Sequence, residues 1–208
     1  RRHTKFRNVT GVQTCALPIL TTNVKDDASG VPVDKVIRVK AEKGTLTSVV
    51  LKSKGGRVEG ELRADGTRWV ASGGLEPATS YRVRATARNG DGKEVRSVST
   101  FTTQSLSLDQ QTYASIAPLQ GETVGVGMPV IVTFDLPVTD QASFEKHMTV
   151  TSTPAQPGSW YWVSSKEAHW RPESYWQAGT KVSVDVGVNG VSAGGGIYGQ
   201  EEIGRAHV

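Results

Sequence analysis

The chain has 208 residues, of which 37% are hydrophobic and 21% are charged, with one Cys and a formal net charge of +4. This length suits one or two soluble domains. No run of about 18 apolar residues occurs in it, which excludes a membrane-spanning helix within this sequence.

Both ends of the chain look like translated sequencing adapter rather than native protein. Residues 202–208 read EIGRAHV and residues 14–19 read TCALPI. The codons GAG ATC GGA AGA GCA CAC GTC can encode the first segment, and ACG TGT GCT CTT CCG ATC the second. The reverse complement of the second string lies inside the first, as it must when one adapter is ligated to both ends of a fragment. We therefore expect residues 1–19 and 202–208 to be adapter-derived and to form no part of the native fold.

The native part, residues 20–201, has a balanced charge. Removing the two ends takes five basic residues from 24 and one acidic residue from 20, which leaves 19 of each. A net charge of zero gives no reason to expect a nucleic-acid partner. The only Cys, Cys15, is lost as well, which excludes a thiol nucleophile, a disulfide and a Cys-ligated metal in residues 20–201.

Residues 20–104 are predicted to form a first all-β module. The clearest strand covers residues 80–88, where Tyr81 and Val83 alternate with Arg82 and Arg84. Further apolar–polar runs are separated by Gly-rich or Asp-Gly turns, which favour hairpins because Gly tolerates positive φ. These runs cover residues 36–39, 45–54, 57–63, 67–70 and 94–103. Six or seven strands at this spacing predict a β-sandwich.

A local motif refines that prediction. Leu75, Pro77, Thr79 and Tyr81 precede and open the clearest strand at alternate positions. This pattern resembles the tyrosine corner of immunoglobulin-like and fibronectin type III sandwiches, in which the Tyr hydroxyl bonds to backbone a few residues upstream. The alternative is an ordinary buried Tyr.

Residues 105–201 are predicted to form a second all-β module. Strands are expected over residues 130–134, 148–152, 160–163, 168–171 and 181–188, with a short helical turn at 142–147. The adapter begins where a final strand should follow, so we expect this sandwich to lack its last strand. A missing strand would expose an unpaired edge and part of the core.

Six aromatic residues crowd one stretch of the second module. They are Trp160, Tyr161, Trp162, Trp170, Tyr175 and Trp176. Three interpretations are open: they fill the core, they form an interface with a neighbouring domain, or they bind glycan. The residues expected at an interdomain interface are Tyr175, Trp176 and Tyr161.

The two modules differ in charge. Residues 20–104 hold 15 basic and 10 acidic side chains, whereas residues 105–201 hold 4 and 9. We favour two independently solvated surfaces. A salt-sensitive electrostatic contact between the modules is the alternative.

Several signatures of the second module together resemble a known family. They are IAPLQGETVGVGMPV at 116–130, FDLPVTD at 134–140, GSW at 158–160, HWRP at 169–172, GTKV at 179–182 and GIYG at 196–199. The set is similar to the immunoglobulin-like domain that precedes the catalytic domain of actinobacterial L,D-transpeptidases. The first module resembles the more membrane-proximal domain of the same enzymes, with GTLTSV at 44–49 as its best match.

The resemblance implies a cell-wall role without catalysis in this chain. Those enzymes make 3→3 cross-links in peptidoglycan with a Cys nucleophile in a Ser-His-Gly-Cys type motif. Residues 20–201 hold neither the Cys nor a His-Gly pair, so His147 and His169 are not expected to be catalytic. The resemblance thus implies spacer and positioning domains, located outside the cytoplasm, whose partner is a C-terminal catalytic domain. It leaves peptidoglycan binding open, and it limits membrane attachment to an N-terminal anchor not present in this sequence.

No other chemistry is expected from the residues. Asp26, Asp27 and Asp34 would suit calcium, but they read better as solvated turn acids. We expect no metal, no cofactor and no catalytic residue. The alternative to the transpeptidase assignment is a pair of fibronectin-type or immunoglobulin-like modules from a secreted adhesin or a glycan-binding hydrolase.

Overall fold

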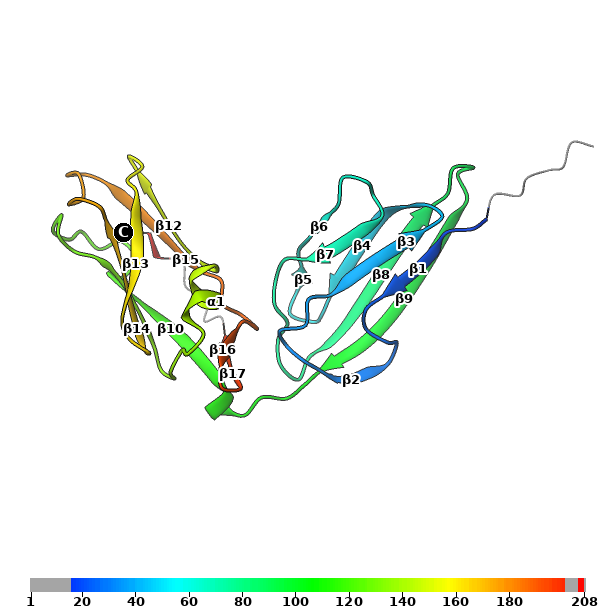
Figure 1. Cartoon of the computed structure of the whole chain (residues 1–208), viewed down its shortest axis with the longest axis horizontal. Coiled ribbons are helices and arrows are strands. Elements are labelled where there is room, and N and C mark those ends of the chain that lie inside the picture. The colour runs from blue at the N-terminus through cyan, green and yellow to red at the C-terminus, as the bar shows by residue number, and fades with distance from the viewer. Residues whose placement is uncertain (1–15, 201–205, 208) are drawn as a thin grey trace, which may run out of the picture.

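The computed structural model describes residues 16–200 and 206–207, and it is almost entirely β-structure. Most of the two segments expected to be adapter-derived therefore lies outside the described residues. Two of the four sheets are built only from strands that precede residues 104–107, and the other two only from strands that follow them. The two groups of sheets lie next to each other along the long axis of the molecule (Figure 1). We call them the first and the second sandwich. No described helix is long and apolar enough to cross a membrane.

The first sandwich packs a four-stranded sheet against a five-stranded sheet. The four-stranded sheet has the order β1-β3-β7-β6 and the five-stranded sheet the order β2-β9-β8-β4-β5. The bounds are β1 Ile19–Thr22, β2 Ala28–Val31, β3 Arg38–Glu42, β4 Thr45–Lys52, β5 Arg57–Val58, β6 Gly60–Leu62, β7 Arg68–Ala71, β8 Ser80–Arg88 and β9 Glu94–Thr103. All pairs are antiparallel except β2 with β9.

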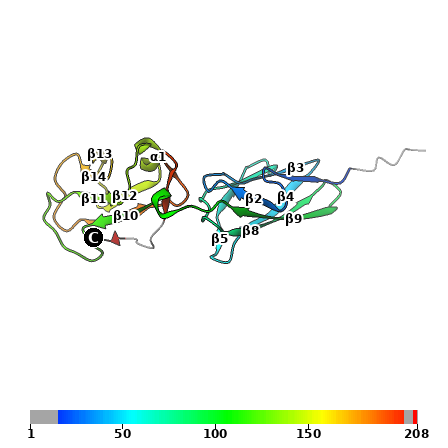
Figure 2. The same ribbon diagram turned by 90° about the horizontal axis from the view of Figure 1, so that it is seen from below.

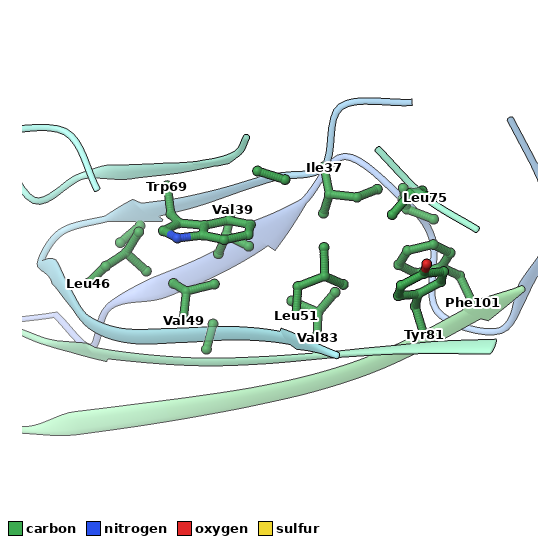
Figure 3. Packing of buried hydrophobic residues seen from close by; sticks show 14 of the residues in the cluster. Ile37, Val39, Leu46, Val49, Leu51, Trp69, Leu75, Tyr81, Val83 and Phe101 are labelled. Atoms are coloured by element: carbon green, nitrogen blue, oxygen red, sulfur yellow. The ribbon is translucent and has the colours of Figure 1, made fainter. Parts of the chain in front are cut away.

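The core of the first sandwich lies between its two sheets (Figure 3). Trp69 of β7 packs toward Leu46 and Val49 of β4, and the ring of Tyr81 stacks on Phe101 at 5.4 Å between centroids. The alternation that predicted β8 is reproduced, because its odd-numbered residues are buried and its arginines are exposed. Sandwich architecture in this half is confirmed.

The second sandwich pairs a six-stranded sheet with a three-stranded sheet. Their orders are β13-β14-β11-β10-β17-β16 and β12-β15-β18. The bounds are η1 Leu108–Gln110, β10 Gln111–Ala117, β11 Val130–Phe134, α1 Gln141–Glu145, β12 Met148–Thr153, β13 Gly158–Ser164, β14 Glu167–Pro172, β15 Lys181–Val186, β16 Ser192–Gly194, β17 Ile197–Gln200 and β18 Ala206–His207. Asp140 caps α1, since its carboxylate accepts from Ser143 N at 3.1 Å.

The expected weak edge of the second sandwich falls at β15. Among the described residues, its outer side is paired at Ser183 and Val184 with the two residues of β18. Two residues of pairing are far less than the six that β15 makes with β12 on its other side. The all-β fold is confirmed, and the absence of a full final strand stays a prediction.

Candidate functional site

The aromatic cluster is divided between core and surface. Trp170 and Trp176 are buried and stack at 5.3 Å between ring centroids, while Trp160 and Trp162 are half-buried against the same core. Two of the indole nitrogens bond inward, Trp160 Nε1 to Met148 O at 3.2 Å and Trp162 Nε1 to Glu145 Oε1 at 2.7 Å. The four tryptophans therefore help to fill the core of the second sandwich.

Trp176, expected at an interdomain interface, is largely buried within the second sandwich. Only 8% of the residue is exposed. Its Nε1 donates to Met128 O at 2.8 Å, and its backbone N donates to Val126 O at 3.0 Å. Trp176 thus ties the β14–β15 loop to the β10–β11 loop. A sequence pattern of adjacent aromatics cannot tell which neighbour turns inward in a loop.

The neighbouring Tyr175 remains available at the same end of the sandwich. It is 77% exposed, beside Val126, which is 45% exposed. An apolar cavity of about 330 Å³ also lies there, and its lining includes Val126, Met128, Trp176 and Val182. We call this end, formed by residues 118–129 and 173–180, the distal loops. It is the surface of the second sandwich best suited to an apolar partner.

Tyr161 lies elsewhere. It is on the outward face of β13, 69% exposed, opposite His169 of β14. Val163, two residues along the same strand, is 53% exposed. Tyr161 and Tyr175 are therefore both exposed, but one lies on a sheet face and the other in a loop.

A second candidate site lies where the two sandwiches meet. Asn189 Nδ2 of the second sandwich donates to Glu76 Oε1 of the first at 2.6 Å. A Cβ added at Gly74 would overlap Asn189 O, and one at Gly190, where φ is +68°, would lie 2.9 Å from Val33 O. We call residues 33, 74–76 and 188–190 the junction. Side chains at its two glycines would force the sandwiches apart.

The junction loop of the first sandwich is held by the predicted tyrosine corner. Tyr81 Oη accepts from Glu76 N at 2.8 Å, five residues upstream, which confirms the corner. Thr103 Oγ1 donates to Glu76 O at 2.6 Å. Burial raises the pKa of the Tyr81 hydroxyl, so it stays protonated beside the core. The corner therefore fixes the backbone of the residue that contacts Asn189.

Sequence reasoning missed the junction. Gly73-Gly74 and Asn189-Gly190 read as ordinary turns, and nothing in either pair marks it as part of a contact. A sign of the contact that is visible only in the structure is that Asn189 Oδ1 is buried without a hydrogen-bond partner. Such an atom carries a desolvation cost and is uncommon in folded proteins.

Among the described residues, no ion pair joins the two sandwiches, despite their opposite net charges. The five ion pairs of the described residues all lie within one sandwich or the other, and the polar contact at the junction is the Asn189–Glu76 hydrogen bond. The favoured interpretation of two separately solvated surfaces agrees with this. The proposed salt-sensitive attraction has no ion pair among the described residues to carry it.

His147 and His169 are both engaged locally. His147 Nδ1 lies 2.8 Å from Ser143 O, and His169 Nε2 lies 2.7 Å from Glu167 Oε1. Neither bonds to a Ser or Thr hydroxyl. Within the described residues, no three His, Cys, Asp or Glu side chains are grouped closely enough to hold a metal ion. Asp26 and Asp27 instead accept from Thr100, its backbone N at 2.7 Å and its hydroxyl at 2.6 Å.

Comparison with known proteins extends these observations. Residues 28–192 match the family model described as a bacterial Ig domain. L,D-transpeptidase 2 of Mycobacterium tuberculosis is 38% identical over 188 residues, which cover 90% of this chain and 45% of that protein. L,D-transpeptidase 5 of the same species is 34% identical over 191 residues, which cover 89% of this chain and 42% of that protein. The chain thus spans less than half the length of these relatives.

A solved structure gives a weaker match. The crystal structure of L,D-transpeptidase 3 from M. tuberculosis is 38% identical over 35% of this chain and 32% of that one, with a TM-score of 0.31. A score that low does not bear on the fold. The family match and the sequence homology are sufficient to assign the family. The chain belongs to the bacterial Ig domain family and is homologous to L,D-transpeptidases along most of its length.

Proposed function

We propose that this chain is the non-catalytic spacer of a peptidoglycan L,D-transpeptidase and lies outside the cytoplasm. The observation that supports it best is the junction. The sandwiches are joined twice, by residues 104–107 and by the contact of Asn189 with Glu76. Two attachments hold a pair of domains at a set separation better than one linker does. A fixed separation is what a spacer needs.

The distal loops supply the place for a catalytic domain. They lie at the start of β15, while the junction lies just beyond its end, so the two surfaces are at opposite ends of the second sandwich. Tyr175 is exposed there beside an apolar cavity. In this arrangement the first sandwich extends away from the enzyme, and the distal loops pack against it.

Catalysis is assigned to the part of the relatives that this chain does not cover. The only Cys of the sequence is Cys15, outside the described residues and inside the segment expected to be adapter-derived. Neither His147 nor His169 is paired with a nucleophile. We expect the purified chain to form no cross-linked product from peptidoglycan stem peptides.

The test uses the complete parent enzyme, obtained by sequencing its locus downstream of the codon for Glu201. Deleting residues 20–104 should leave cross-linking of soluble stem peptides unchanged but reduce cross-linking of intact wall. Tyr175→Ala should weaken docking of the catalytic domain, while Tyr161→Ala serves as the matched exposed control. Loss of activity on soluble peptides after the deletion would reject the spacer role. Further β-modules downstream, in place of a catalytic domain, would favour an adhesin.

A further inference from the structure

The outer face of the five-stranded sheet in the first sandwich is densely cationic. Cross-strand register places Lys52 of β4 directly opposite Arg82 of β8, and Arg57 of β5 directly opposite Lys52. Arg84 follows two positions after Arg82, on the same face. Arg88 and Arg96 complete the set, which we call the cationic face.

Few carboxylates neutralise this face. Glu94 is shared by Arg88 at 2.7 Å and Arg96 at 3.6 Å, and Glu59 approaches Arg57 at 3.8 Å. Asp26 and Asp27 lie at the β9 edge, bonded to Thr100. Lys52, Arg82 and Arg84 form no ion pair among the described residues, and all three are exposed.

The arrangement costs stability in the isolated molecule. Side chains directly opposite on antiparallel strands have Cβ atoms about 4.5–5.5 Å apart, and like charges there repel. In the four-stranded sheet, by contrast, the charge of Lys40 is neutralised by Glu42 at 2.7 Å. An unpaired cluster on one face is what an anionic partner would stabilise.

The shape of the face favours a planar partner. Its cations come from four adjacent strands, so they form a two-dimensional array rather than a row along a groove. Val98, 57% exposed, and the half-buried Val50 lie on either side of Arg84 in the same row. Apolar side chains among cations suit the surface of a bilayer, where headgroups carry the charge.

We propose that the cationic face binds the surface of an anionic phospholipid bilayer. The second sandwich, net −5 over residues 105–201 from 4 basic and 9 acidic side chains, is repelled by the same surface. The two sandwiches follow one another along the long axis (Figure 2), so the net charge changes sign along the molecule. This goes beyond the spacer role and does not depend on it.

The test is co-sedimentation of the full chain with vesicles of phosphatidylglycerol, of phosphatidylcholine, or of their mixture. We expect binding that rises with the phosphatidylglycerol fraction and is lost in about 0.5 M salt, where the screening length falls to only a few Å. Equal binding to pure phosphatidylcholine, or binding that salt does not weaken, would overturn the proposal.

Matched variants locate the binding surface. Arg82→Gln with Arg84→Gln should lower the partition coefficient roughly 25-fold, at about fivefold for each cation removed. Arg38→Gln with Arg63→Gln removes the same charge from exposed positions elsewhere on the first sandwich, and should change it little. Equal losses in the two pairs would show a general charge effect and reject the face. Binding to a soluble polyanion such as polyphosphate, without binding to vesicles, would reject the bilayer as well.

Discussion

Tyr81 contributes both to the core of the first sandwich and to the tyrosine corner. Its ring belongs to the core of the first sandwich, and its hydroxyl accepts from Glu76 N at 2.8 Å. Glu76 in turn binds Asn189 across the junction. One phenol therefore links the packing of a core to the contact between two domains.

Tyr81→Phe should destabilise the first sandwich by about 1–3 kcal/mol, because Glu76 N loses its acceptor in a part-buried site. The stacked ring is kept, so the loss is that of the hydrogen bond. Hydrogen exchange of peptides covering β8 and β9 measures it within the full chain. Tyr161→Phe, at an exposed position, is the control and should leave exchange unchanged.

The effect of the same substitution on stability should depend on pH. The folded state raises the pKa of Tyr81 above its ordinary value of 10.0. Above pH 10 the unfolded Tyr ionises while the folded one stays protonated, so this residue's contribution to stability is full below pH 10 and falls above it. The stability advantage of the wild type over Tyr81→Phe should therefore shrink between pH 10 and 11. An advantage that grows over that range would contradict the assignment.

At the scale of elements, strands with strong alternation could be predicted and strands that depend on distant partners could not. Residues 80–88 and 130–134 were predicted with the bounds of β8 and β11. Strands β2 and β17 were missed, because Gly interrupts both and each is held by parallel pairing with a remote strand. Periodicity records which face is buried, but it does not record such pairing.

The candidate sites follow the same division. The tyrosine corner lies within seven residues of sequence, from Leu75 to Tyr81, and could be recognised there. The junction requires two turns more than 100 residues apart to meet, since Glu76 and Asn189 are separated by 113 positions. Glycine pairs at turns give no sign of what lies across from them.

The open edge of β15 leads to a prediction about stability. A chain continued through the native sequence after Glu201 should complete this edge and raise the melting temperature of the second sandwich. A gain of about 1 kcal/mol corresponds to roughly 4–8 °C for a domain of this size. Thermal unfolding followed by Trp fluorescence reports mainly this half, because four of the five Trp lie in it. An unchanged melting temperature would mean that β15 needs no further partner.

For the whole molecule, the junction predicts a fixed separation of the sandwiches. Gly74→Ala places a methyl group against Asn189 O, so the contact should open while both sandwiches stay folded. Small-angle X-ray scattering should then show a broader distribution of interatomic distances. Gly90→Ala is the matched control, because an added Cβ there meets nothing within 4 Å. A distribution as narrow as that of the wild type would show that residues 104–107 alone fix the arrangement.

The fit at the junction also bears on how such a molecule changes over evolutionary time. Asn189 and Gly190 match the surface offered by Val33 and Gly74 in the other half. Recombination that exchanged one sandwich alone would bring together loops that had never been selected to meet. A change on one side of this fit should therefore be accompanied by a compensating change on the other side.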